Sequence, residues 1–506
     1  MTTYKANPFT VSAVHHVHTS VPSTEESCLG LRTLITLQLV FFAASIIFVR
    51  YHYIPFATDG FATIEFSDGL NAVVFALTSV IAVLWGLRLD VPTRGVFLIA
   101  LLPVSCQAAL PGIALALDFP VQIIAIFFLP SMLAGAWRAM PRLILAACVL
   151  LSLLGLSSLL GDAPMISLRA LARFAVYLFS GLSAGVVLAS HPVHLMRALY
   201  LLASGACMIA GLVVARVLTG TNVGDLGQTF AAPFVVDRGS GAAYICWGVV
   251  VLAVANSNAL AWRRSLIRVG LLATALAVIL SGTRAALVGL VVLLIAMTLS
   301  NRRYIPVILL VIISVTGLFA VARSSVFMTQ LSQRVLPFVS GGRAGLQEAV
   351  QTVSSAEERL RRWRIAGEMV QAYPLFGIGY ERFQDWVVKW PTAPYMAAYS
   401  VHSESLKMAA EGGLPSFAAY VSLVLGSLVA GLRRIRKISG DANSFLLIAM
   451  LGVLVYTVQG VFNNYQQISK VTIPYFFLIA VAYSIASSTA TPESAVGLSA
   501  SSESTL

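Results

Sequence analysis

Long apolar runs alternate with short polar segments along almost the whole chain. A helix that crosses a bilayer needs about 20 mostly apolar residues. By that measure we expect spanning helices over 33–49, 70–87, 95–110, 120–136, 142–160, 170–190, 197–218, 239–256, 266–282, 284–300, 304–322, 403–431, 443–461 and 469–487. The division is least clear around 110–120, where Pro111 and Pro120 interrupt the pattern, and at 282–284, where two runs nearly touch. The pattern therefore predicts an all-α polytopic membrane protein with about 12–14 transmembrane helices.

The composition supports this class. Hydrophobic residues make up 58% of the chain and charged residues only 11%, whereas a soluble domain carries about a quarter charged residues. A soluble enzyme is therefore excluded, and membrane lipids are expected partners. A formal net charge of +12 would suggest nucleic acid in a soluble protein. Here the charge follows the loops on one side of the membrane, so we expect no nucleic-acid partner.

Lysine and arginine concentrate in alternate loops. Six loops of the same parity carry Arg88/Arg94, Arg138/Arg142, Arg197, Arg263/Arg264/Arg268, Arg302/Arg303 and Arg433/Arg434/Arg436/Lys437. Positive residues favour the cytoplasmic side, so these loops, the tail 1–31 and a disordered tail 488–506 are predicted to be cytoplasmic. The remaining chain divides into a transmembrane bundle 32–322, an outward loop 323–402 and C-terminal transmembrane helices 403–487. In a Gram-negative inner membrane this loop faces the periplasm.

The outward loop 323–402 is the longest polar segment between apolar runs. Apolar residues recur there at helical spacing, which predicts one or two amphipathic helices lying against the membrane surface. Pro374 ends this pattern, and Gly377 and Gly379 allow a tight turn. Such helices either belong to a functional site or simply cover the bundle, and their spacing does not decide between the two.

Five arginines lie at membrane depth or on the side where positive residues are disfavoured: Arg169, Arg173, Arg216, Arg238 and Arg284. An arginine near the centre of a spanning segment costs about 2.5 kcal/mol or more, so such residues often mark a pathway or a site. The alternative is that each extends from a helix end to the lipid headgroups. Arg238 and Arg284 face the side of the basic loop, which favours an anionic ligand. Guanidinium favours phosphate because it bonds two oxygens at once.

His402 lies at the start of a predicted spanning helix, two residues before Glu404. Imidazole titrates near neutrality and accepts a proton from a sugar hydroxyl. The alternative is a capping or structural histidine. The sequence carries no Walker loop, dinucleotide fingerprint, zinc-protease motif or nucleophile elbow. It also has no outward cluster of histidine and carboxylate residues, so we expect no metal and no cofactor.

Two stretches of the sequence carry a resemblance to a known family. The first is Ser281-Gly-Thr-Arg284, at the entry to an apolar helix. The second is the ordered series Arg359-x-x-x-Trp363, Tyr373-Pro-Leu-Phe-Gly-Ile-Gly379, His402-Ser-Glu-Ser-Leu and Ala410-Glu-Gly-Gly-Leu-Pro415. Together they resemble the motifs of the O-antigen ligase/polymerase superfamily of bacterial inner-membrane glycosyltransferases, over about 280–420. One departure is Ser403, where the family commonly has Asn.

This resemblance implies a glycan donor on undecaprenyl diphosphate, an acceptor hydroxyl, and no metal or nucleotide. The arginines that would bind the diphosphate and stabilise charge on the leaving group are Arg238, Arg284, Arg359 and, as a fourth contact, Arg216. His402 would orient or deprotonate the acceptor, so that a direct displacement inverts the anomeric centre. Arg284 and His402 are thus the predicted catalytic residues. Glu404 either tunes His402 or only caps the helix.

Several functions remain open within and beyond this family. A ligase gives the glycan to lipid A-core, a polymerase to another lipid-linked repeat unit, and a protein O-oligosaccharyltransferase to serine or threonine. We favour the ligase, although the shared motifs do not separate the three. A flippase for the same lipid-linked sugars is the non-enzymatic alternative. It would predict paired repeats and broken helices near mid-membrane, whereas here the polar residues concentrate in one loop and its rim.

Overall fold

The computed structural model describes most of the helical part of the chain. The described residues are 30–48, 51–54, 63–66, 77, 80–104, 106–110, 113–119, 121–218, 238–258, 261–281, 283–300, 304, 305, 309, 345–392 and 400–488. The predicted tails 1–31 and 488–506 lie almost entirely outside this set. So do half of the predicted span 70–87, most of the predicted span 304–322, and the first part of the outward loop.

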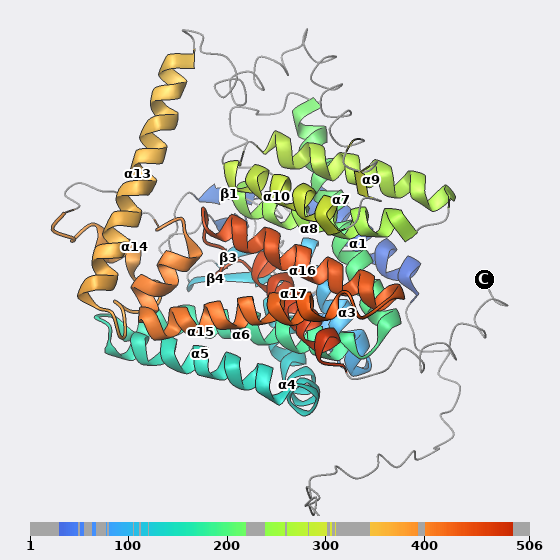
Figure 1. Cartoon of the computed structure of the whole chain (residues 1–506), viewed down its shortest axis with the longest axis horizontal. Helices are drawn as coiled ribbons and strands as arrows, with labels where there is room; N and C mark the ends of the chain where they lie inside the picture. The colour runs from blue at the N-terminus through green and yellow to red at the C-terminus, as the bar shows by residue number, and fades with distance from the viewer. Residues whose placement is uncertain are drawn as a thin grey trace, which may run out of the picture.

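Helices dominate the described chain (Figure 1). They are α1 (Leu31–Phe48), α3 (Val91–Leu101), α4 (Val121–Ala139), α5 (Pro141–Leu160), α6 (Pro164–Ala189), α7 (Pro192–Leu218), α8 (Arg238–Asn258), α9 (Ala261–Leu280), α10 (Arg284–Ser300), α13 (Gly345–Ala372), α14 (Phe383–Val387), α15 (Glu404–Arg434), α16 (Gly440–Gly460) and α17 (Ser469–Ser487). Among the described residues, α4–α8 and α15–α17 are eight helices long and apolar enough to cross a membrane. Shorter apolar helices occur in α1, α3 and α10. The predicted class, a polytopic membrane protein built of helices, is confirmed.

A small sheet is the main departure from the predicted helices. Four strands, β1 (Tyr51–Ile54), β2 (Thr63–Phe66), β3 (Cys106–Leu110) and β4 (Ile113–Phe119), pair in the order β1-β2-β3-β4. The β1/β2 and β3/β4 pairs are antiparallel, whereas β2 and β3 are parallel. The predicted span 95–110 is therefore wrong in its second half, because α3 and a short 3₁₀ turn end at Val104. Pro103 lies in that turn, and a proline cannot donate the backbone hydrogen bond that would continue a helix.

Close helix contacts fix the centre of the bundle. The tightest packing joins α6 to α17, where Gly181 and Gly185 let the two backbones meet. A Cβ atom on either glycine would lie 2.4 Å from a carbonyl oxygen of α17, that of Ile473 or Phe477. Small residues at such contacts are typical of helix packing in membranes.

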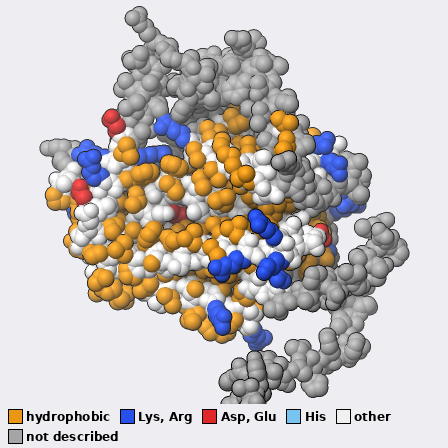
Figure 2. Space-filling model, in the orientation of Figure 1, with side chains coloured by type: hydrophobic (Ala, Val, Ile, Leu, Met, Phe, Trp, Pro, Cys, Tyr) orange, Lys and Arg blue, Asp and Glu red, His pale blue; other side chains and the backbone are white. Residues whose placement is uncertain are grey.

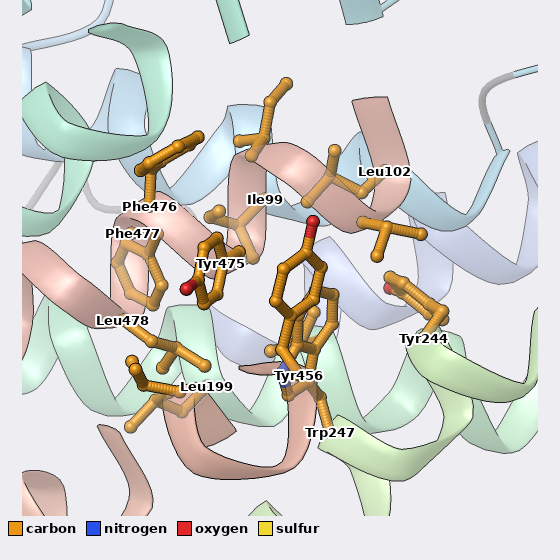
Figure 3. Close-up of a cluster of buried hydrophobic side chains, with 14 of the residues drawn as sticks. Ile99, Leu102, Leu199, Tyr244, Trp247, Tyr456, Tyr475, Phe476, Phe477 and Leu478 are labelled. Carbon is orange, nitrogen blue, oxygen red and sulfur yellow. The ribbon is translucent and has the colours of Figure 1, made fainter. Parts of the chain in front are cut away.

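The aromatic core lies between α8, α16 and α17 (Figure 3). The rings of Tyr456 and Tyr475 are stacked with centroids 3.7 Å apart, and Trp247 is stacked on Tyr456 at 6.0 Å. The Trp247 indole donates to the carbonyl of Gly452 at 3.2 Å, so its polar edge is satisfied inside the bundle. This core joins the helices beneath the site described below.

The surface is apolar along the sides of the bundle. Figure 2 shows a broad hydrophobic face, with lysine and arginine gathered toward the right of the view and around α13 at the left. α13 runs across one end of α15 and its neighbours in Figure 1, and it packs on α15. We call this end of the bundle the α13 end. The basic residues Arg433 and Arg434 close α15 at the opposite end.

Candidate functional site

The helices that carry the sequence motifs meet at the α13 end. Gly289 of α10 packs on α16, and a Cβ atom there would lie 2.7 Å from the amide nitrogen of Gln459. Gly460, at the end of α16, packs in the same way on Glu404 of α15, at 2.9 Å. Because Arg284 begins α10 and His402 precedes α15, both predicted catalytic residues lie at this end.

His402 occupies a constrained position just before α15. Its φ angle is 54°, in the left-handed region that few residues other than glycine adopt. The next residue, Ser403, is the N-cap of α15, and its hydroxyl accepts a hydrogen bond from the Leu406 N–H at 3.5 Å. Asn and Ser are about equally good N-caps. The departure from the family's Asn at this position therefore has a structural explanation.

The His402 imidazole is held in its neutral form. Burial, as the larger cause, and the nearby charges of Arg359 and Arg362 together lower the pKa of His402 to about 4. A histidine in this state keeps a free ring nitrogen at neutral pH, so it can accept a proton or a hydrogen bond. The folded protein favours the neutral imidazole of His402. The free energy of unfolding therefore decreases as the pH falls below 6.5, the ordinary pKa of histidine.

The arginines around His402 form a cationic cluster. Burial lowers the pKa of Arg359, and Arg284 and Arg362 contribute in the same direction through charge repulsion. Arg362 is only 5% exposed and pairs with Glu358 one turn earlier, at 3.0 Å. Holding like charges together is unfavourable, so the cluster favours an anion. The structure thus brings Arg284, Arg359 and His402 together with Arg362, and their roles in binding and catalysis stay predictions.

The other two predicted phosphate ligands lie at the same end of the bundle. Arg216 lies in the last turn of α7, where its side chain is partly buried, and Arg238 is the first residue of α8. α8 packs on α16 through Trp247 and Gly452. The start of α9, which follows α8, lies near the start of α16, because Arg263 and Asp441 both interact electrostatically with Tyr200. The first residue of α8 therefore lies toward the end of α16. The side chain of Arg238 lies outside the described part of the structure. Binding of phosphate by either arginine stays a prediction.

The glycine turn of the outward loop interlocks with α15. Gly413 interrupts α15 with φ 79° and ψ 171°, and a Cβ atom there would lie 2.3 Å from the carbonyl oxygen of Leu375. The interruption exposes backbone groups of α15 to the turn. Ile378 N–H donates to the Ala410 carbonyl at 3.0 Å, and Leu414 N–H donates to the Pro374 carbonyl at 2.8 Å. The two family-like motifs therefore form a single hydrogen-bonded unit.

Buried charges strengthen this unit. Glu411 is 1% exposed, and its carboxylate accepts hydrogen bonds from the N–H groups of Glu381 and Phe383 at 2.8 and 3.0 Å. Lys407 is 2% exposed and forms an ion pair with Glu381. A buried charge is tolerated only when it is paired and hydrogen-bonded. These residues consequently fix the outward loop on α15.

Glu404, the acidic residue nearest to His402 in the sequence, lies in a pocket of tyrosines. Its carboxylate accepts hydrogen bonds from the hydroxyls of Tyr456 and Tyr420, the latter at 3.1 Å, and from the Tyr465 N–H at 3.3 Å. The contacts show that Glu404 does more than begin the helix. It ties α15 to α16 and to the segment that follows α16.

This segment, Phe462–Ile468 between α16 and α17, is not among the site residues that the sequence analysis predicts. The polar run Asn463-Asn-Tyr-Gln-Gln467 separates two apolar helices on the predicted outward side. This pattern in the sequence could have indicated that the segment belongs to the site. Gln467 donates to the hydroxyl of Tyr380 at 3.1 Å, and Gln466 accepts from the same hydroxyl at 3.2 Å. Burial raises the pKa of Tyr380, which therefore stays neutral. The segment thus joins the outward loop and the start of α15 as a third polar part of the site.

Comparison with known proteins identifies one family match. Residues 269–421 match the family model described as O-Antigen ligase. The matched region runs from α9 into α15 and contains Arg284, Arg359 and His402. No curated protein sequence matches the chain. Within the described residues, no group of three or more His, Cys, Asp and Glu side chains is arranged to hold a metal ion.

Proposed function

Because the chain belongs to the O-antigen ligase/polymerase superfamily through residues 269–421, we propose that it ligates O-antigen to lipid A-core. The donor is a glycan on undecaprenyl diphosphate, and the acceptor is a hydroxyl of the core sugar. In this proposal the protein lies in the inner membrane with the α13 end toward the periplasm, where both lipid-linked substrates are exposed.

The observation that carries this proposal is the cluster of Arg284, Arg359 and Arg362 around a neutral histidine. A diphosphate between these guanidinium groups offers several oxygens for charge-assisted hydrogen bonds. The same groups stabilise the negative charge that develops on the leaving diphosphate. Arg216 and Arg238 lie at the same end of the bundle and complete the proposed donor site.

The proposed reaction is a single displacement. The acceptor oxygen forms a bond to the anomeric carbon while the bond from that carbon to the diphosphate oxygen breaks, so the anomeric centre inverts. The proton of the acceptor hydroxyl passes to His402, and undecaprenyl diphosphate leaves with the bonding electron pair. His402 later returns the proton to water. Arg284 acts on the leaving group and is the second proposed catalytic residue.

Donor binding also prepares the histidine. In the free protein two cations oppose the protonation of His402, which makes it a weak base. A bound diphosphate neutralises part of that positive charge, and neighbouring negative charge raises the pKa of an imidazole. His402 therefore becomes a stronger base only when the donor is in place.

The test replaces Arg284 and, separately, His402 by alanine in cells that lack the native gene. Arg361→Ala is the control, because Arg361 is an exposed arginine of α13. With membrane levels equal, we expect full-length O-antigen to remain on its lipid carrier in the two site variants and to join lipid A-core in the control. Single repeats joined to core would instead indicate a polymerase. Normal polysaccharide in both site variants would refute the proposed site.

A further inference from the structure

We propose that the segment Asn463–Tyr465 is a positioning element for His402 and holds the chain on both sides of this histidine. The inference rests on the proposed role of His402 in the reaction. It adds residues that lie outside the matched family region, which ends at 421.

The first attachment precedes His402 in the chain. The Ser400 hydroxyl donates a hydrogen bond to the side-chain oxygen of Asn464 at 2.8 Å. The same hydroxyl accepts from the backbone N–H of His402 at 3.4 Å. Asn464 is thus connected to the backbone of His402 through a single side chain.

The second attachment follows His402. The backbone N–H of Glu404 donates to the carbonyl of Asn463 at 3.1 Å, and the Glu404 carboxylate accepts from the Tyr465 N–H. The Asn463 amide in turn donates to the Tyr465 hydroxyl at 2.7 Å. Residues 400 and 404 are therefore both fixed to one short segment, and His402 is the midpoint between them.

Two further features show why such an attachment is needed. His402 has a left-handed backbone, which costs about 1–2 kcal/mol in a residue other than glycine and persists only where the surroundings impose it. The segment also reaches the arginine cluster, since Tyr465 interacts electrostatically with Arg359. Phe462, the residue just before the segment, packs on Trp363 of α13 with ring centroids 6.2 Å apart. One segment thereby sets the position of the histidine relative to the arginines.

The experiment uses the full-length protein in lipid nanodiscs, with undecaprenyl diphosphate-linked O-antigen as donor and lipid A-core as acceptor. Asn464→Leu and Ser400→Ala each remove one partner of the first attachment, and Ser400→Thr retains the hydroxyl. We expect kcat to fall about 10- to 100-fold in the first two variants, because a displacement of about 1 Å has effects of that size. The donor KM should change less than threefold, and Ser400→Thr should retain most of the activity.

Two readouts separate positioning from a general structural role. The double variant should be no slower than either single variant, because both changes break one connection. The acid limb of kcat/KM should also move to higher pH, because a displaced His402 moves away from Arg359 and Arg362. The titratable groups of the other two elements here are the Glu404 carboxylate, which accepts from the backbone N–H of Tyr465, and the Tyr465 hydroxyl, which accepts from Asn463; both are unchanged in these variants.

The outcomes distinguish this inference from the proposed function. Failure of the wild type to join O-antigen to lipid A-core would refute the proposed function, and full activity in His402→Ala would refute the role of His402 and this inference with it. An inactive His402→Ala together with normal kcat in Asn464→Leu would refute the positioning role alone. Multiplicative losses in the double variant, or a raised KM at normal kcat, would also overturn it. Melting temperatures within about 3 °C of the wild type ensure that folded proteins are compared.

Discussion

The state of His402 leads to a prediction about two pH profiles of the same enzyme. The profile of kcat/KM reports the free protein, and the profile of kcat reports the complex with donor. The pKa of His402 in the free protein is about 4, so kcat/KM should fall only near that pH. In the complex the diphosphate offsets the arginine charges, and kcat should begin to fall at a higher pH.

The size of the difference follows from the electrostatics. Lowering the pKa of histidine from 6.5 to about 4 corresponds to about 3 kcal/mol that opposes protonation. An opposite charge nearby changes a pKa by about 1–3, so we expect the acid limb of kcat to lie about 1–2 pH units above that of kcat/KM. Burial remains in the complex and keeps the limb below about 6.5.

Arg359→Gln tests the cause directly. Removing this cation should move the acid limb of kcat/KM toward neutral pH, besides lowering the rate at every pH through weaker donor binding. At pH 5 a histidine with pKa 4 is about 90% neutral and one with pKa 6.5 about 3% neutral, so the largest additional loss at pH 5 is about thirtyfold.

The assay compares rates at pH 5 and pH 8 for the wild type, Arg359→Gln and the control Arg361→Gln, which removes the same charge from an exposed position on α13. The ratio of the two rates cancels the effect on binding that is independent of pH. If this ratio were the same in all three proteins, the reasoning that links Arg359 to the protonation of His402 would be refuted.

Substitutions at three further places in the structure test the support of the site, each by the melting temperature of the purified protein. Gly413→Ala places a Cβ atom 2.3 Å from the Leu375 carbonyl at a glycine-only backbone angle and should destabilise the fold by about 3 kcal/mol or more; an unchanged melting temperature would contradict the interlock. Lys407→Leu leaves Glu381 without its buried cation and should cost about 3–5 kcal/mol, and adding Glu381→Gln should recover part of the loss. Ser403→Ala should cost about 1 kcal/mol, whereas Ser403→Asn should be neutral because both residues cap helices; equal losses would exclude the cap.

Much of this architecture can be predicted from the sequence, because a membrane restricts which segments can cross it and where charged residues can lie. Apolar runs of sufficient length gave the positions of α4–α8 and α15–α17, and arginines in costly places pointed to the α13 end. Arg284, Arg359 and His402 were identified as candidates from charge, hydropathy and motif order. The structure places the three close together, and their roles in the reaction stay predictions.

Other features depend on contacts that periodicity cannot show. A short apolar run is compatible with helix or strand, so the apolar pattern predicts the end of a helix where the structure has the strand Cys106–Leu110. Glu411 and Lys407 appear in the sequence as charges inside a spanning helix, and only the turn before α15 explains them. The segment Asn463–Tyr465 matters through bonds to residues about 60 positions earlier. No local pattern reports such pairs.

The buried charges of α15 also bear on how the protein is made. Glu404, Lys407 and Glu411 all lie in the first eight residues of this helix, and each charge opposes insertion into lipid by about 2–3 kcal/mol on the scale for the helix centre. Their partner Glu381 and the turn that receives Gly413 precede α15 in the chain, so the ribosome delivers them first. Tyr456 and Tyr465, which bind Glu404, emerge later. The start of α15 therefore reaches its final depth only after α16 has been synthesised, and truncation before α16 should leave α15 unassembled and open to membrane proteases.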